Sequence, residues 1–118
     1  MNVHSYFYIG DTMSEIKAFF DEKLRSHLND NEDLVEDIDA TYLFNVDNES
    51  WYVDLTMFPP VIEAKTDEAD CTIGITSEDL MAIANKELDG MSAYMQGKLK
   101  IDGNMALSLR LQSILEFD

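Results

Sequence analysis

The sequence predicts a single domain, residues 1–118, in which helices are combined with five strands. Two patterns lead to this prediction: apolar residues recur at helical spacing in several segments, and they alternate with a period of two in others. A length of 118 residues suits one hydrophobic core and leaves no room for a second. The apolar fraction of 46% is ordinary for a globular protein, so the acidic composition does not by itself indicate disorder.

The first predicted element is an amphipathic helix from about Thr12 to Leu28. Its apolar stripe consists of Ile16, Phe19, Phe20, Leu24 and Leu28. Residues 29–39 then carry six carboxylates and no Lys or Arg. Leu34, Val35 and Ile38 have a spacing that a short helix against the core could use. We favour a solvated connector instead, because charge-rich runs are usually solvated.

Five segments have the alternation of strands. Residues 42–46 and 51–57 are predicted to pair as a hairpin across the turn residues Asp47–Ser50. Pro59 and Pro60 lack backbone donors and are expected to end the second strand. The remaining strands are predicted at residues 61–65, 71–75 and 98–101.

Helical patterns return in the second half of the chain. Thr76 is predicted to cap a helix with Asp79 as its reciprocal partner. The apolar stripe of that helix is Leu80, Met81, Ile83 and Ala84. Gly90 breaks the pattern, and residues 91–95 predict one or two further turns. A last helix at 104–115 is apolar on several sides, so it either lies between the sheet and other helices or faces an apolar partner that is not protein.

The charge and the cysteine count exclude several classes of protein. The net charge of −16 and the pI near 4.1 argue against nucleic-acid binding and against tight docking on an anionic membrane, leaving transient membrane contact at most. The sequence has neither an apolar run of transmembrane length nor the pattern of a secretory signal. Cys71 is the single cysteine, so we expect no intrachain disulfide and a cytoplasmic, reducing location.

Candidate chemistry is sparse, and we expect no catalytic residues, no metal site and no cofactor. His4 and His27 are the only histidines, with no second ligand at zinc spacing. The acidic stretch departs from the calcium-loop template at Leu34, and no glycine follows there. Cys71 falls inside a predicted strand, where a buried, inert thiol is expected.

Several segments resemble the sterol carrier protein type 2 family, and the match spans about Leu43 to Leu115. The segments that carry the resemblance are Trp51–Leu55, Ala69–Ile73, Ser77–Leu80, Gly97–Met105 and Leu109–Gln112. The resemblance implies an α+β fold with a five-stranded mixed sheet covered by helices and a hydrophobic tunnel against the C-terminal helix. It also implies binding and intracellular transfer of sterols, fatty acids, acyl-CoA or phospholipids without catalysis. The chain ends in Glu116-Phe117-Asp118, so a peroxisomal tripeptide of the S-K-L type is not supported.

Within this picture, the lipid is expected to contact the apolar residues of several elements and one amide. The expected lipid-binding residues are Ile16, Phe20, Phe44, Trp51, Met81, Met91, Met95, Met105, Leu109 and Gln112. Met105, Leu109 and Gln112 share one face of the last helix on a helical wheel. Gln112 either offers a hydrogen bond to the polar end of the lipid or is a surface residue near a helix end. The nearest candidate cations for a carboxylate are Lys98, Lys100 and Arg110, and neutral lipid ends are preferred.

A tunnel has an energetic consequence. At ~24 cal/mol per Å³ of empty core, a rigid void of ~300 Å³ would cost about 7 kcal/mol, against a domain stability of ~5–15 kcal/mol. The tunnel is therefore expected to carry lipid, hold water or partly collapse. The alternative function is a protein-interaction module with a filled core that docks through its acidic surface on a basic protein partner. A small hydrolase or isomerase ranks third, because the sequence has no recognisable nucleophile–base pair.

Overall fold

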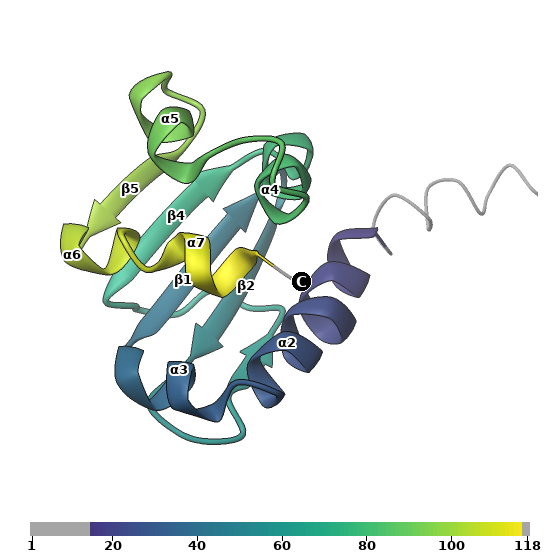
Figure 1. The fold of residues 1–118 in the computed structure, drawn as a ribbon, viewed down its shortest axis with the longest axis vertical. Coiled ribbons are helices and arrows are strands. Elements are labelled where there is room, and N and C mark those ends of the chain that lie inside the picture. Colours follow the sequence, from purple (N-terminus) through teal and green to yellow (C-terminus); the bar gives the residue numbers. More distant parts are fainter. Residues whose placement is uncertain (1–14, 117–118) are drawn as a thin grey trace, which may run out of the picture.

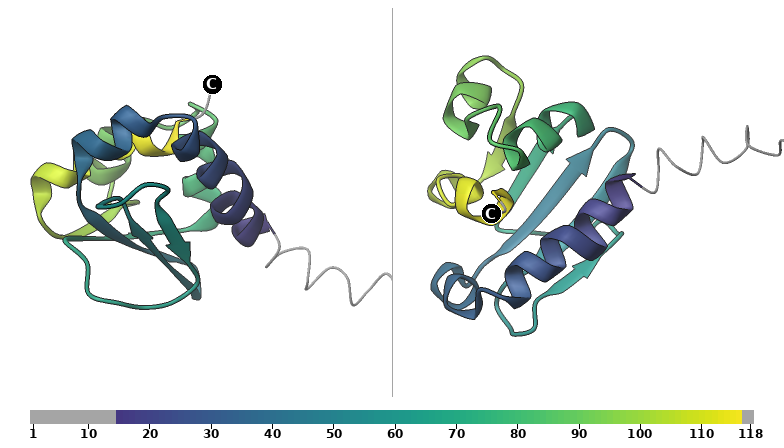
Figure 2. Two further views of the ribbon diagram at one scale, coloured as in Figure 1. Left: turned by 90° about the horizontal axis from the view of Figure 1, so that it is seen from below. Right: turned by 45° about the vertical axis from the view of Figure 1, so that its right-hand side comes forward.

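A five-stranded sheet with helices packed on one of its faces forms the domain in the computed structural model, which describes residues 15–116 (Figure 1). The strand order is β3-β2-β1-β4-β5; β1 and β4 run parallel, and the other neighbours are antiparallel. The strands are β1 Thr41–Val46, β2 Glu49–Asp54, β3 Val61–Glu63, β4 Cys71–Ile75 and β5 Lys100–Gly103. Figure 2 shows the helices on one side of this sheet. The predicted α+β class and the five-stranded mixed sheet are confirmed.

The helices form the second layer. Their bounds are η1 Phe19–Leu24, α2 Arg25–Asn29, α3 Glu32–Ile38, α4 Ser77–Ala84, α5 Gly90–Met95, α6 Met105–Ser108 and α7 Leu111–Leu115. Residues 15–18 are α-helical and lead directly into η1, which has the i→i+5 hydrogen bonds of a π-helix where the sequence predicted an α-helix. All five residues of the predicted apolar stripe are buried. The predicted start at Thr12 lies outside the described residues.

The acidic stretch corrects one prediction, because residues 32–38 form helix α3 and not a connector. Val35 and Ile38 are buried, and Leu34 packs against the core. The carboxylates of the helix point outward and are exposed. Burial of one apolar side of the helix therefore outweighs the repulsion among carboxylates, which keep their hydration.

The register of the strands brings apolar side chains into one row beneath the helices. Phe44 on β1 lies opposite Trp51 on β2 and opposite Ile73 on β4. Ile73 in turn lies opposite Ile101 on β5. Because alternate side chains of a strand point to opposite faces, this row lies on a single face of the sheet. It provides the floor on which the helices pack.

Among the strand ends that differ from the predicted ones, three have a local hydrogen bond that explains the difference. β2 ends at Asp54 and not at residue 57, because the Asp54 carboxylate accepts from the Thr56 N–H at 2.8 Å and forms a turn. β3 ends at Glu63, whose carbonyl accepts from the Lys65 N–H at 3.0 Å. β5 begins at Lys100 and not at residue 98, because the Lys98 N–H donates to the Ala93 carbonyl of α5 at 2.8 Å.

The predicted hairpin and helix cap are confirmed, but the last helix is wrong as a single element. Asp47 and Asn48 form the two-residue turn between β1 and β2, and the Thr76 hydroxyl accepts from the Asp79 N–H at 3.1 Å. The predicted helix at 104–115 is divided into α6 and α7 by a turn. The Tyr42 hydroxyl donates to the Leu107 carbonyl at 2.7 Å, and the Arg110 N–H donates to the same oxygen at 3.1 Å. These bonds hold a tight turn where a continuous α-helix was expected.

Candidate functional site

A cavity of about 400 Å³ is lined by residues of α5, β5 and the α6–α7 segment. These elements lie toward the β4–β5 side of the sheet in Figure 1. Its lining is mainly apolar and consists of Asp89, Gly90, Met91, Tyr94, Leu99, Ile101, Met105, Ala106, Ser108, Leu109, Leu111 and Gln112. Leu99 and Leu111 are buried and form the inner part. Met91 and Leu109 are more than half exposed, so the cavity opens to the surface between α5 and α6.

The structure brings four of the predicted lipid-binding residues to this cavity. They are Met91, Met105, Leu109 and Gln112. The last three were placed together on the wheel of a continuous helix, and they still share the lining although a turn divides that helix. The turn displaces the two halves without rotating these side chains away from the cavity.

The other predicted residues lie elsewhere. Four of them are buried in the core on the β1–β2 side: Ile16, Phe20, Phe44 and Trp51. Phe20 stacks on Trp51 with ring centroids 5.0 Å apart and planes at 5°. Met81 is partly buried against the core, and Met95 is 79% exposed outside the lining. A role for these six in lipid contact stays a prediction.

Sequence reasoning did not include several lining residues in its lipid-binding set: Tyr94, Leu99, Ile101, Ala106 and Leu111. Two patterns carried a signal for them. Tyr94 follows Met91 at i+3 on one helix face, and Leu99 and Ile101 alternate with Lys98 and Lys100. Leu111 is buried in the core and also borders the cavity.

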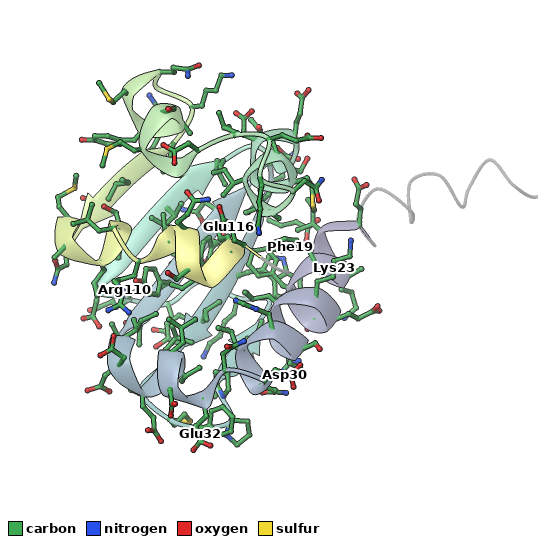
Figure 3. The ribbon with its side chains drawn as sticks, viewed as in Figure 1. Phe19, Lys23, Asp30, Glu32, Arg110 and Glu116 are labelled. Atoms are coloured by element: carbon green, nitrogen blue, oxygen red, sulfur yellow. The ribbon has the colours of Figure 1, made fainter. Side chains whose placement is uncertain are left out.

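Gln112 joins two walls of the cavity. Its Oε1 atom accepts a hydrogen bond from the backbone N–H of Gly90 at 2.9 Å, and its Nε2 atom donates to the Glu116 carboxylate, at the end of α7 in Figure 3. A Cβ atom at position 90 would lie only 3.1 Å from Oε1, so glycine permits this close approach. Gln112 is therefore neither a surface residue nor directed solely at the cavity. It holds the start of α5 against α7.

The predicted cations do not enter the cavity. The guanidinium of Arg110, which is labelled in Figure 3, pairs with the Asp37 carboxylate of α3 at 2.7 Å. Neither Lys98 nor Lys100 belongs to the lining. Lys100 precedes Ile101 on β5, so its side chain leaves the opposite face of the sheet. Asp89 is the one charged residue in the lining, and its carboxylate caps α5 by accepting from the Ser92 N–H at 3.1 Å. The cavity therefore offers no cation to a carboxylate ligand.

Residues 15–116 contain no group of three or more His, Cys, Asp or Glu side chains that could hold a metal ion. The ring of His27 on α2 makes a hydrogen bond with the Ser113 carbonyl of α7 at 3.0 Å, and His4 lies outside the described residues. Cys71 is buried in β4, and burial raises the pKa of its thiol to about 11. No helix within the described range has the length and apolar character to cross a bilayer.

Comparison with known proteins identifies relatives over most of the chain. Residues 20–116 match the model of the SCP-2 sterol transfer family. The chain is 36% identical to sterol carrier protein 2 of Rattus norvegicus over an alignment of 90 positions that covers 70% of this chain and 16% of that protein. The chain thus spans about a sixth of the length of this relative.

Two solved structures show the same fold. Sterol carrier protein 2 of Yarrowia lipolytica, in its apo form, matches with a TM-score of 0.68 at 23% identity, covering 78% of this chain and 83% of that chain. Palmitated SCP2L2 from Aedes aegypti matches with a TM-score of 0.54 at 26% identity, covering 66% of this chain and 73% of that chain.

Proposed function

The chain belongs to the SCP-2 sterol transfer family, and from this membership we propose that it binds a lipid in the cavity between α5, β5 and α6–α7 and transfers it without catalysing a reaction. The ligand classes that we propose are sterols, fatty acids, acyl-CoA and phospholipids. The observation that carries the proposal is the mainly apolar cavity itself. Its volume of about 400 Å³ falls within the ~300–1,000 Å³ typical of ligand pockets.

The polar groups of the lining favour a lipid with a neutral polar end. Ser108 and Gln112 supply a hydroxyl and an amide beside the apolar walls, and Asp89 is the charged member. A carboxylate ligand would meet the negative charge of Asp89 and no cation of the lining, so it would have to leave its own head group at the mouth. A relative of this chain from Aedes aegypti is described as palmitated, which supports an acyl chain as one occupant.

Ligand binding is expected to stabilise the protein. A sealed, dry void of this size would cost about 10 kcal/mol at ~24 cal/mol per Å³, so water or a ligand must occupy much of the space. A ligand at 100 times its Kd raises stability by about 2.7 kcal/mol through mass action.

The test is extraction of the purified protein followed by lipid mass spectrometry, and melting of the delipidated protein with and without added sterol, fatty acid or phospholipid. We expect co-purified lipid and a rise in Tm with at least one lipid class. Absence of both would contradict the proposal.

A matched pair of variants locates the effect in the cavity. Ile101→Trp places a larger side chain in the lining and should abolish the rise in Tm with ligand. Lys100→Trp changes the neighbouring residue of β5, which faces the other side of the sheet, and should retain it. Equal responses of the two variants would place the ligand elsewhere.

A second candidate function, docking on a basic protein partner, is supported by the exposed carboxylates of α3. These are Glu32, Asp33, Glu36 and Asp37. The extraction experiment separates the candidates, because an interaction module has no need to retain lipid.

A further inference from the structure

Within the described residues, most of the large exposed apolar side chains lie around the mouth of the cavity. Seven large apolar side chains are exposed in residues 15–116, and five of them lie on α5, on α6 or in the turn after α6. These five are Met91, Tyr94, Met95, Met105 and Leu109, with exposed fractions of 54%, 42%, 79%, 46% and 67%. Scattered apolar side chains are normal on a protein surface, but a contiguous group marks an interaction site.

The two helices present these side chains in a way that suits contact with one broad surface. Met91, Tyr94 and Met95 stand at positions i, i+3 and i+4 of α5, so they share one face of the helix. Four of the five side chains also belong to the cavity lining, and Met95 alone stands outside it. A surface that covered this group would therefore cover the mouth.

The charge of this region differs from that of the rest of the chain. Residues 89–110 contain Lys98, Lys100 and Arg110 against Asp89 and Asp102, a net charge of +1. The whole chain has a charge of −16, so the remaining residues carry −17. The mouth thus lies in a segment with almost no net charge, whereas the chain as a whole is strongly repelled by anionic surfaces.

We propose that α5 and α6 form a docking face for a neutral, zwitterionic phospholipid bilayer, which places the cavity mouth against the membrane while lipid enters or leaves; this inference rests on the proposed function. Flexible methionine side chains adapt to an irregular apolar phase. Tyr94 has the amphipathic ring favoured at a membrane interface. Lys98 is exposed in the segment between α5 and β5, from which a lysine can extend its ammonium group to the phosphates of lipid head groups while its stem stays among apolar groups.

The experiment is flotation of the full chain with phosphatidylcholine vesicles, and it uses one variant and one matched control. Met95→Glu places a charge at the most exposed position of the face without touching the cavity lining. Met57→Glu makes the same change at an exposed methionine outside this face, which is 51% exposed in the loop after β2. We expect wild type to float with the vesicles, Met95→Glu to bind at least tenfold more weakly, and Met57→Glu to stay within twofold of wild type. Vesicles that contain phosphatidylserine should bind wild type more weakly than phosphatidylcholine at low salt.

Three results would overturn this inference. If wild type does not float with the vesicles, the face is left to a protein partner. If Met95→Glu and Met57→Glu lose vesicle binding equally, the contact is not at the mouth. If wild type binds vesicles with phosphatidylserine more tightly, the charge argument fails. A lysophospholipid below its micellar concentration separates this failure from that of the proposed function. If it raises the Tm of both wild type and Met95→Glu while vesicles do not bind, cavity binding stands and docking falls. If no lipid raises the Tm of wild type, both fall.

Discussion

The helix layer packs closely over one half of the sheet and leaves a cavity over the other. Over β2 and β3, the helix through η1 and α2 packs closely on the sheet. The ring centroid of Phe20 lies 5.0 Å from that of Trp51 and 5.5 Å from that of Phe44. The Arg25 guanidinium donates a hydrogen bond to the Ile62 carbonyl of β3 at 2.9 Å. Over β4 and β5, the helices α5, α6 and α7 enclose a cavity of about 400 Å³. Figure 2 shows the long first helix and the group of short helices over different parts of the sheet.

The difference comes from side-chain volume and helix length. The first helix delivers large side chains to the sheet turn after turn, and aromatic rings fill the space. The helices on the other side have four to six residues each, and small residues such as Gly90, Ala106 and Ser108 face the space between them. Packing against one face of a sheet therefore does not decide between a core and a binding cavity. The volume that each helix brings to that face decides it.

The largest expected effect tests the filled side. Phe20 is fully buried, so Phe20→Ala removes a stacked ring and should cost about 3–5 kcal/mol of unfolding free energy. Leu109→Ala truncates a residue of the cavity wall that is 67% exposed and should change stability by less than ~0.5 kcal/mol. Denaturant unfolding of both variants without ligand measures the contrast. Similar losses in the two variants would mean that both sides are packed alike.

A smaller effect on the free energy of unfolding is expected at the hydrogen bond that joins α5 and α7 beside the cavity. Gln112→Leu removes the acceptor of the half-buried Gly90 N–H and should cost about 1–3 kcal/mol. Because the bond fixes the start of α5, hydrogen exchange of the Gly90 amide should also speed up. Gln96→Leu, at an exposed position that ends α5, is the matched control and should be nearly neutral. A Gln112→Leu variant as stable as Gln96→Leu would show that the hydrogen bond between Gln112 and Gly90 is not needed to hold the walls of the cavity in place.

Sequence patterns predicted the elements whose causes are local. β4 has the predicted bounds, β1 begins one residue earlier than predicted, and Thr76 caps α4 as expected, because alternation and capping depend on neighbours in the chain. The break between α6 and α7 was not predictable in this way. It coincides with a hydrogen bond from Tyr42, which is 65 residues away from Leu107 in the sequence.

The site was predicted only in part for a related reason. Apolar residues look alike in a sequence whether they fill a core or line a cavity, so Phe20 and Trp51 were grouped with Met105 and Leu109, although the structure stacks the first two on each other. A helical wheel grouped Met105, Leu109 and Gln112 correctly, because their spacing along one short segment of sequence determines that they share a face. The partner of Gln112, the Gly90 N–H, belongs to another helix, and no pattern in either segment indicates the contact.

The smallest expected effect concerns α3, where packing of apolar residues competes with charge. The contact and charge of Glu32 raise the pKa of Glu36 above its ordinary value, so the folded protein holds this proton more firmly than the unfolded chain does. Protonation of Glu36 therefore favours the folded state, and this gain is present at low pH and is lost as the pH rises through the raised pKa. Glu36→Gln should accordingly raise the Tm slightly at pH 7 and lose its advantage at a pH below the ordinary pKa of glutamate, where Glu36 of wild type is itself protonated. Glu87→Gln, at an exposed position after α4 and outside the helices, should have no comparable effect on Tm across the same pH range. A gain for Glu36→Gln that stayed constant with pH would mean that repulsion within α3 is not its source.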